Sequence, residues 1–208
     1  MWIAIAAVVI TLSSVGPIMS MVDEPKYSVI SEQGNIQIRE YVPIIVAETK
    51  VSGERKEAIN QGFRIIADYI FGNNSPNQKI AMTAPVIQEA DISEGNEIAM
   101  TAPVTQQADK NQWKVRFVMP EEYTLSTLPK PNNSKIKLIQ INSQRYAVIK
   151  FSGTSSDENL GEHKDKLLQY IKQNRLQAIG EPVFAFYNPP WTLPFLKRNE
   201  IMIEIKKG

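Results

Sequence analysis

Apolar and polar residues alternate along several short stretches of the chain. The alternation is clear at Ile36 and Ile38, and again at Val115 and Phe117. A period of two places such side chains on one buried face of a strand, with polar neighbours on the wet face. The pattern predicts nine or ten strands, among them the ranges 27–30, 36–41, 43–51, 113–119, 135–141, 145–151, 183–187 and 200–205.

Two longer stretches carry apolar residues at helical spacing. The first covers about 54–71, and its apolar face is formed by Ile59, Phe63, Ile66 and Ile70. The second covers about 157–173, and its apolar face is formed by Leu160, Leu167, Leu168 and Ile171. Gly72 is expected to end the first helix. Ser155 and Glu158 form a capping-box pattern at the start of the second.

The order strand, Ser-Gly, helix, strand occurs twice. Ser52-Gly53 and Ser152-Gly153 end the two leading strands, and Pro85 and Pro182 introduce the strands after the helices. Such a repeat predicts two similar halves. The fold class is therefore α+β: an internally duplicated, distorted antiparallel β-barrel with two amphipathic helices. A cleft between two halves is a common place for a ligand.

A shorter repeat lies inside the first half. The sequence IAMTAPV occurs at 80–86 and again at 98–104, with a polar linker between the copies. Two β-prone segments joined in this way predict a hairpin or two adjacent strands. Each copy contains a proline, so each should be an edge strand, a strand end or a bulge.

The N-terminal segment differs from the rest of the chain. Residues 1–21 carry no charged side chain, and 2–12 are almost continuously apolar. This composition fits a signal peptide, an uncleaved membrane anchor or a buried N-terminal helix. We expect an exported protein, periplasmic or secreted, or one anchored to a membrane through residues 1–21 alone. The remaining range 25–208 is expected to be one domain.

Composition removes several classes of function. The chain has no cysteine and a single histidine, His163, so thiolate chemistry, iron–sulfur clusters and multi-histidine metal sites are excluded. Its 23 basic and 22 acidic side chains leave a net charge of +1, which argues against a nucleic-acid partner. The motifs of serine hydrolases, zinc proteases and phosphate-binding loops are absent, and an enzyme is not expected. Oligomeric state is left open.

Six short motifs occur in order along the chain. They are IREY at 38–41, YIFGN at 69–73, KIAMTAPV at 79–86, FVMP at 117–120, FSG at 151–153 and YNPPW at 187–191, which continues to RNE at 198–200. Together they resemble the SOUL heme-binding protein family, over about 27–205. The doubled IAMTAPV is similar to the bacterial branch of that family.

The resemblance implies binding of heme or a related tetrapyrrole in a largely apolar cleft beside the first helix. It also implies a distorted barrel of two related halves. Members of the family are known as binders or carriers, so we expect a non-catalytic scavenger, buffer or carrier of heme. Two alternatives remain open: an enzyme that acts on tetrapyrroles, and a protein-interaction module on the same fold.

The resemblance also suggests ligand-contacting residues. These are Ile59, Phe63 and Ile66 on the first helix, Met82, Trp191 as an aromatic wall, and Arg64, Lys197 and Arg198 for the propionates. Each has a plainer interpretation as core, gap filler, loop anchor or solvated charge. His163 is either a structural histidine or an axial iron ligand. It lies on the second helix, away from the family's cleft.

Overall fold

The computed structural model describes residues 24–90, 112–188 and 191–207. Nine strands form one antiparallel sheet, in the order β1-β2-β9-β11-β10-β5-β6-β3-β8. Their bounds are β1 Tyr27–Gln33, β2 Ile36–Tyr41, β3 Ile44–Ser52, β5 Val86–Ala90, β6 Gln112–Val118, β8 Ile136–Ile141, β9 Gln144–Phe151, β10 Ala178–Phe186 and β11 Asn199–Ile205. The predicted strands are therefore confirmed.

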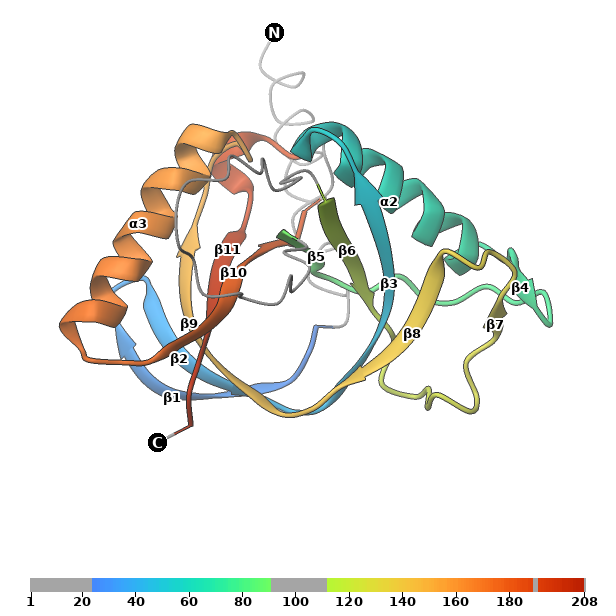
Figure 1. Ribbon diagram of the computed structural model, residues 1–208, viewed down its shortest axis with the longest axis horizontal. Coiled ribbons are helices and arrows are strands. Elements are labelled where there is room, and N and C mark those ends of the chain that lie inside the picture. Colours follow the sequence, from blue (N-terminus) through green and yellow to red (C-terminus); the bar gives the residue numbers. More distant parts are fainter. Residues whose placement is uncertain (1–23, 91–111, 189–190, 208) are drawn as a thin grey trace, which may run out of the picture.

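The sheet curls into a half-barrel with two helices on its outer side (Figure 1). The helices are α2, Arg55–Ile70, and α3, Asp157–Gln173. A second, two-stranded sheet pairs β4, Asn74–Ser75, with β7, Lys130–Pro131. A short 3-10 turn, η2, covers Pro194–Leu196. The predicted α+β class is confirmed. Among the described ranges, no helix is long and apolar enough to span a bilayer.

The internal duplication is visible in the strand pairing. The range of β8 is that of β2 moved on by 100 residues, and β9 follows β3 in the same way. Each half also exchanges a strand: β2 precedes β3 in the chain but pairs with β9, whereas β8 precedes β9 but pairs with β3. The halves meet where β5 pairs with β10. Strand exchange therefore binds the two halves into one sheet.

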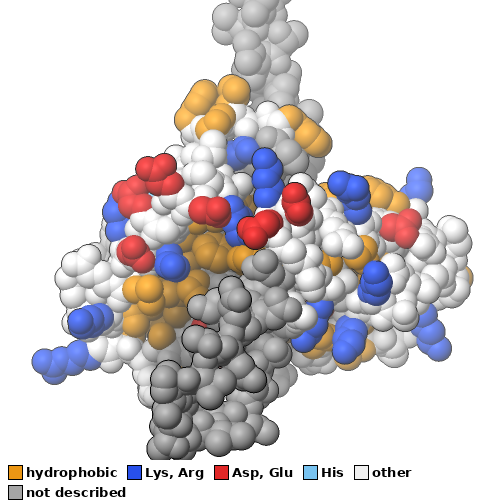
Figure 2. Space-filling model, turned by 45° about the horizontal axis from the view of Figure 1, so that its top comes forward, with side chains coloured by type: hydrophobic (Ala, Val, Ile, Leu, Met, Phe, Trp, Pro, Cys, Tyr) orange, Lys and Arg blue, Asp and Glu red, His pale blue; other side chains and the backbone are white. Residues whose placement is uncertain are grey.

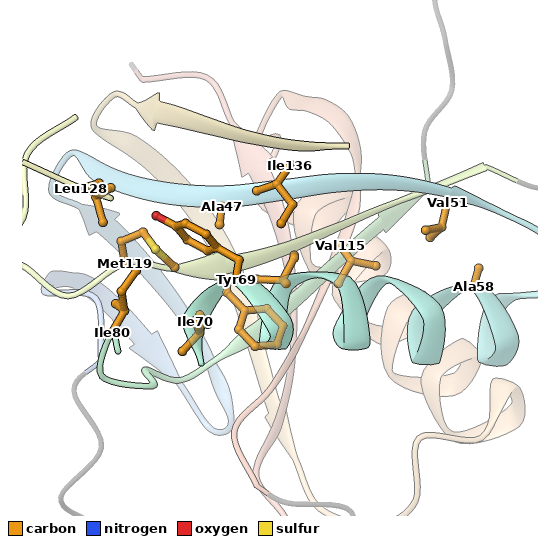
Figure 3. Packing of buried hydrophobic residues seen from close by; sticks show 12 residues of the cluster. Ala47, Val51, Ala58, Tyr69, Ile70, Ile80, Val115, Met119, Leu128 and Ile136 are labelled. Atoms are coloured by element: carbon orange, nitrogen blue, oxygen red, sulfur yellow. The ribbon is translucent and has the colours of Figure 1, made fainter. Parts of the chain in front are cut away.

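The first helix buries a different stripe from the one predicted. Its buried residues are Ala58, Gly62, Ile66, Ala67, Tyr69 and Ile70. Figure 3 shows Ala58, Tyr69 and Ile70 of α2 facing Ala47 and Val51 of β3 and Val115 of β6. Small residues at 58 and 62 let the helix approach the sheet closely, so Ile59 and Phe63 are left at the helix margin. The expectation that these two belong to the buried stripe was wrong.

The second helix has the predicted bounds but differs in two details. Leu160, Leu167 and Ile171 are buried, whereas Leu168 is exposed. The N-cap is Ser156, whose hydroxyl accepts a hydrogen bond from the Asn159 amide at 3.4 Å. The capping box predicted one residue earlier was wrong, because the extended backbone continues through residue 156.

Only the first copy of the short repeat can be compared with the prediction of a hairpin or two adjacent strands, and most of it is not a strand. Residues 80–85 are irregular, and β5 begins only at Val86, directly after Pro85. The proline thus marks a strand end, as predicted, because it cannot donate to the ladder. The second copy, 98–104, lies outside the described residues. Pro182 lies inside β10 at a register irregularity, so it does not start a strand as expected.

Candidate functional site

Strands β5 and β10 lie in the sheet between the strands that the two helices cover. Helix α2 packs on β3 and β6, and α3 packs on β9 and β11. The pair β5–β10 separates these two supports in the sheet. On its helix side the pair carries Val86, Gln88, Phe184 and Phe186, which face one another as the cross-strand pairs Val86–Phe186 and Gln88–Phe184. We call these four residues the central strip.

Aromatic side chains connect α2 to the central strip. Phe63 is 38% exposed at the helix margin and meets the buried ring of Phe117 edge to face, with the ring centroids 5.2 Å apart. Phe117 on β6 is paired with Val86, which is in turn paired with Phe186. Ile59 lies one turn before Phe63 on the same face. An apolar row therefore crosses from the first helix to the second half of the sheet.

Gln88 is the polar member of the strip. Its side chain is only 5% exposed, and its amide oxygen has no hydrogen-bond partner. A buried amide oxygen without a donor carries a desolvation cost, so a ligand N–H or O–H at this position would be stabilised. Sequence reasoning missed Gln88. Its signal was a polar residue that lies between Val86 and Ala90 on an otherwise apolar face of β5.

The connection between β10 and β11 carries the other predicted contacts. Trp191 is 83% exposed, and Lys197 is half-buried. The backbone amide of Gly153 donates to the carbonyl of Pro194 at 2.9 Å, which holds this connection against the strand end before α3. The connection follows β10 directly, so it continues from the Phe186 end of the central strip.

Arg198 is engaged by carboxylates of the chain itself. Its guanidinium lies within 2.9 Å of both carboxylate oxygens of Glu24 and 3.0 Å from Glu200 Oε1. It also stacks over the ring of Tyr187, 3.8 Å from the centroid. A ligand propionate at Arg198 would compete with these two carboxylates. Its predicted contact with the ligand stays a prediction.

Glu200 belongs to a fully buried ion pair on the inner face of the half-barrel. Arg39 Nη1 donates to Glu200 Oε2 at 2.8 Å, and Arg39 Nη2 donates to Oε1 at 3.1 Å. The hydroxyl of Tyr187 adds a bond of 2.8 Å. Burial acts to raise the pKa of Glu200, but the hydrogen bond and charge of Arg39 outweigh it, so the pKa is lowered. The pair is charged at neutral pH and structural in character.

His163 lies away from the first helix. Its ring stacks on Phe151 with centroids 4.1 Å apart, and its Nδ1 is 2.8 Å from the Asn159 carbonyl. Phe151 lies on β9, four strands along the sheet from β6. At about 4.8 Å per strand this is roughly 19 Å along the sheet from Phe117. The described residues contain no group of three or more metal-ligating side chains.

The remaining predicted residues have different environments. Ile66 is fully buried in the core under α2, so it does not reach the surface. Arg64 is exposed beside Phe63, and Met82 is exposed in the segment before β5. The structure therefore brings Ile59, Phe63 and Arg64 together along α2. Trp191, Lys197 and Arg198 belong to the connection between β10 and β11, and Arg198 is turned to Glu200 on the inner face, away from the helix side that carries the central strip.

A hollow of about 480 Å³ lies on the opposite side of α2 from the strip. Ile65 and Gln61 of the helix line it together with Lys50, Lys135 and Lys137. A charged lining of this kind does not suit a flat apolar ring, because the ring would desolvate the ammonium groups. The strip side of α2 is the more apolar of the two.

Comparisons with solved structures show where else this fold occurs. The structure is similar to the C-terminal domain of EcmrR, with a TM-score of 0.61 at 12% identity, covering 88% of this chain and 99% of that one. It is also similar to a hydrolase from Listeria innocua, with a TM-score of 0.54 at 9% identity, covering 85% and 94%. At such identities the likeness concerns the fold alone.

Sequence comparison is more specific. The chain is 27% identical to Heme-binding protein 2 from Homo sapiens over 180 residues, covering 85% of this chain and 80% of that protein. The family model described as SOUL heme-binding protein matches residues 22–204. The match spans both helices and the curled sheet except its last residue, Ile205. The chain therefore belongs to the SOUL heme-binding protein family.

Proposed function

We propose that this protein binds heme or a related tetrapyrrole without catalysing its conversion, on the central strip beside α2. The protein acts as a scavenger, buffer or carrier of the ring. The observation that supports this most directly is the apolar row that runs from Phe63 at the margin of α2 over the buried ring of Phe117 to Val86 and Phe186, which are only half-buried. Aromatic side chains with partly exposed faces suit a flat hydrophobic ligand.

Charges at the rim suit the two propionates. Arg64 is exposed next to Phe63 and has no ion pair with a described residue. Lys197 lies at the other end of the strip. Arginine and lysine favour carboxylates through charge-assisted hydrogen bonds. The ring would then lie over the apolar row with its acidic edge turned towards solvent.

Binding of heme would not depend on coordination of its iron by a histidine of this chain. The single imidazole is stacked on Phe151 in the other half, and its Nδ1 is bonded to the helix backbone. Binding would then rest on apolar burial, with an affinity that changes little between iron-containing and metal-free rings. Gln88 would accept a hydrogen bond from a donor on the ring or from a bound water.

A hemin titration of the full chain, followed at the Soret band, tests the proposal. Saturable binding is expected, and Phe63→Ala should weaken it about tenfold, which corresponds to about 1.4 kcal/mol. Phe71→Ala is the matched control, because Phe71 is an exposed aromatic residue at the end of the same helix and lies outside the strip. His163→Ala should bind as the unaltered protein does.

Other results would move or remove the site. Loss of binding in His163→Ala alone would transfer the site to α3. Equal weakening in Phe63→Ala and Phe71→Ala would mean that hemin binds exposed aromatic surface without specificity. A free-hemin spectrum at all protein concentrations would refute binding altogether.

The non-catalytic part of the proposal has its own test. Its support is the description of the family as heme-binding, together with the absence of enzyme motifs in the sequence. Hemin and metal-free protoporphyrin should be recovered unchanged by chromatography after incubation in excess over protein. Conversion of more than one equivalent per chain would instead favour an enzyme acting on tetrapyrroles.

A further inference from the structure

The loop after β10 exposes several large apolar side chains close together in the sequence. Four large apolar side chains lie within six residues: Trp191 is 83% exposed, Leu193 53%, Phe195 71% and Leu196 62%. Isolated exposed residues are normal on a protein surface, but a contiguous patch of this kind marks an interaction site. We call these four residues the apolar loop. Figure 2 shows orange side chains at the top of the view, above a band of mixed charges.

The apolar loop is held in place by backbone hydrogen bonds. Pro194 opens the η2 turn, in which the Leu196 amide donates to the Leu193 carbonyl and the Lys197 amide donates to the Pro194 carbonyl. The Gly153 amide fastens the same Pro194 carbonyl to the strand end before α3. The exposed rings are thus presented by a fixed turn, which reduces the entropy lost when they are buried against a partner.

The base of the loop is tied to the start of the described chain. Arg198 follows the apolar loop and is bonded to both carboxylate oxygens of Glu24 at 2.9 Å. Glu24 comes three residues after the uncharged segment 1–21. Three residues of chain span at most about 11 Å. A membrane that residues 1–21 entered would therefore begin within that distance of Glu24, which is bonded at the base of the apolar loop.

We propose that the apolar loop is a membrane-docking surface, which lies in the interfacial region of a lipid bilayer beside the N-terminal segment. Tryptophan favours the bilayer interface, and the neighbouring phenylalanine and leucine side chains can enter the acyl boundary. The net charge of +1 gives no strong electrostatic attraction. Docking should thus rest on apolar burial and persist at high salt. This inference goes beyond the proposed tetrapyrrole binding and does not depend on it.

Tryptophan fluorescence of the full chain tests the proposal. The variant Trp2→Phe/Trp113→Phe keeps Trp191 as its one tryptophan. With phosphatidylcholine vesicles, its emission should shift to the blue, and brominated acyl chains should quench at least half of it, in low and high salt alike. The matched control is Trp2→Phe/Trp191→Phe, whose Trp113 packs against the core under α2 and should not be quenched.

A second comparison covers the case in which the Trp113 substitution disturbs folding. With Trp113 and Trp2 retained, Trp191→Phe should remove a distinct part of the bromolipid quenching seen in the unaltered protein. Both assays contain no tetrapyrrole, so their failure leaves the hemin titration unaffected.

Three results would overturn the proposal. In the first, Trp191 stays unquenched although Trp2, as the one remaining tryptophan, is quenched on the same vesicles. In the second, the Trp191 emission shifts to the blue without lipid as protein concentration rises, which would assign the loop to a second copy of the chain. In the third, the emission is already blue-shifted without lipid at every concentration, which would mean that the chain covers its own loop.

Discussion

The two halves share a backbone plan but place their buried charges at different positions. In the half of the sheet that α3 covers, Arg39 on β2 pairs with Glu200 on β11. The corresponding positions in the half that α2 covers are Ile139 on β8 and Lys114 on β6. In the half that α2 covers, Glu48 pairs with Arg116 at 2.7 Å. The corresponding positions in the half that α3 covers are Val148 and Met202. Neither ion pair therefore has a counterpart at the matching positions of the other half.

The helices differ in a related way. Gly62 of α2 lies so close to β6 that an added Cβ would be 2.6 Å from Val115 Cγ2. By the spacing of the Tyr-Ile pairs, the corresponding residue of α3 is His163, which stacks on Phe151. The first helix thus sits low on the sheet and leaves apolar residues at its margin. The two halves therefore keep one frame but pack their helices on it differently.

The largest expected effect concerns the buried ion pair. Glu200→Gln leaves the Arg39 guanidinium buried without its countercharge, and should lower the free energy of unfolding by about 3–5 kcal/mol. Glu48→Gln in the first half should cost roughly 1–2 kcal/mol, because Arg116 keeps Glu89 at 2.5 Å. Urea unfolding of both variants measures the difference. Equal losses would contradict the view that Arg39 relies on one carboxylate whereas Arg116 has two.

A smaller effect is expected at the closest approach of α2 to the sheet. Gly62→Ala places a methyl group against the Cβ and Cγ2 of Val115, which lies on a central strand and cannot move easily. The substitution should destabilise the fold by about 1–3 kcal/mol, although alanine is the better helix former. The measurement is the shift in the urea midpoint. A stabilised variant would show that α2 can lift from the sheet at little cost.

The smallest effect, of opposite sign, is expected in the other helix. Gly161 on α3 has nothing within 4 Å of an added Cβ. Gly161→Ala should therefore raise the free energy of unfolding by about 0.5–1 kcal/mol through helix propensity alone. The measurement is the thermal unfolding midpoint of Gly161→Ala, compared with that of Gly62→Ala. Should both alanines change stability with the same sign, the contrast in packing between the helices would be wrong.

Much of the local structure could be predicted from the chain. The bounds of α3 and β2 agree with the predicted ranges, because hydrophobic spacing repeats over many residues there. The duplication followed from matching Ser-Gly pairs and helix endings. The buried stripe of α2 could not be predicted in the same way. Apolar spacing placed Phe63 in it, but the close fit of Gly62 against Val115 turned Phe63 to the margin.

Only some residues of the candidate site could be predicted from the sequence. Phe63, Arg64 and Trp191 followed from the resemblance to the family, and their contact with a ligand stays a prediction. Gln88 and Phe186 were missed, because neither their pairing partners nor their burial can be read from β5 or β10 alone. The engagement of Arg198 by Glu24 joins residues 174 positions apart, which no local pattern can indicate.

The sequence by itself determined the period of each element, the repeat of strand and helix, the single histidine and the family. These properties depend on neighbouring residues, and local sterics and hydrophobic spacing fix them. Only the tertiary structure decided the exchange of β2 and β8, the Arg39–Glu200 pair and the central strip. The reason is that a period of two sets which face of a strand is buried. Which strand lies beside it is decided by the packing of the whole sheet.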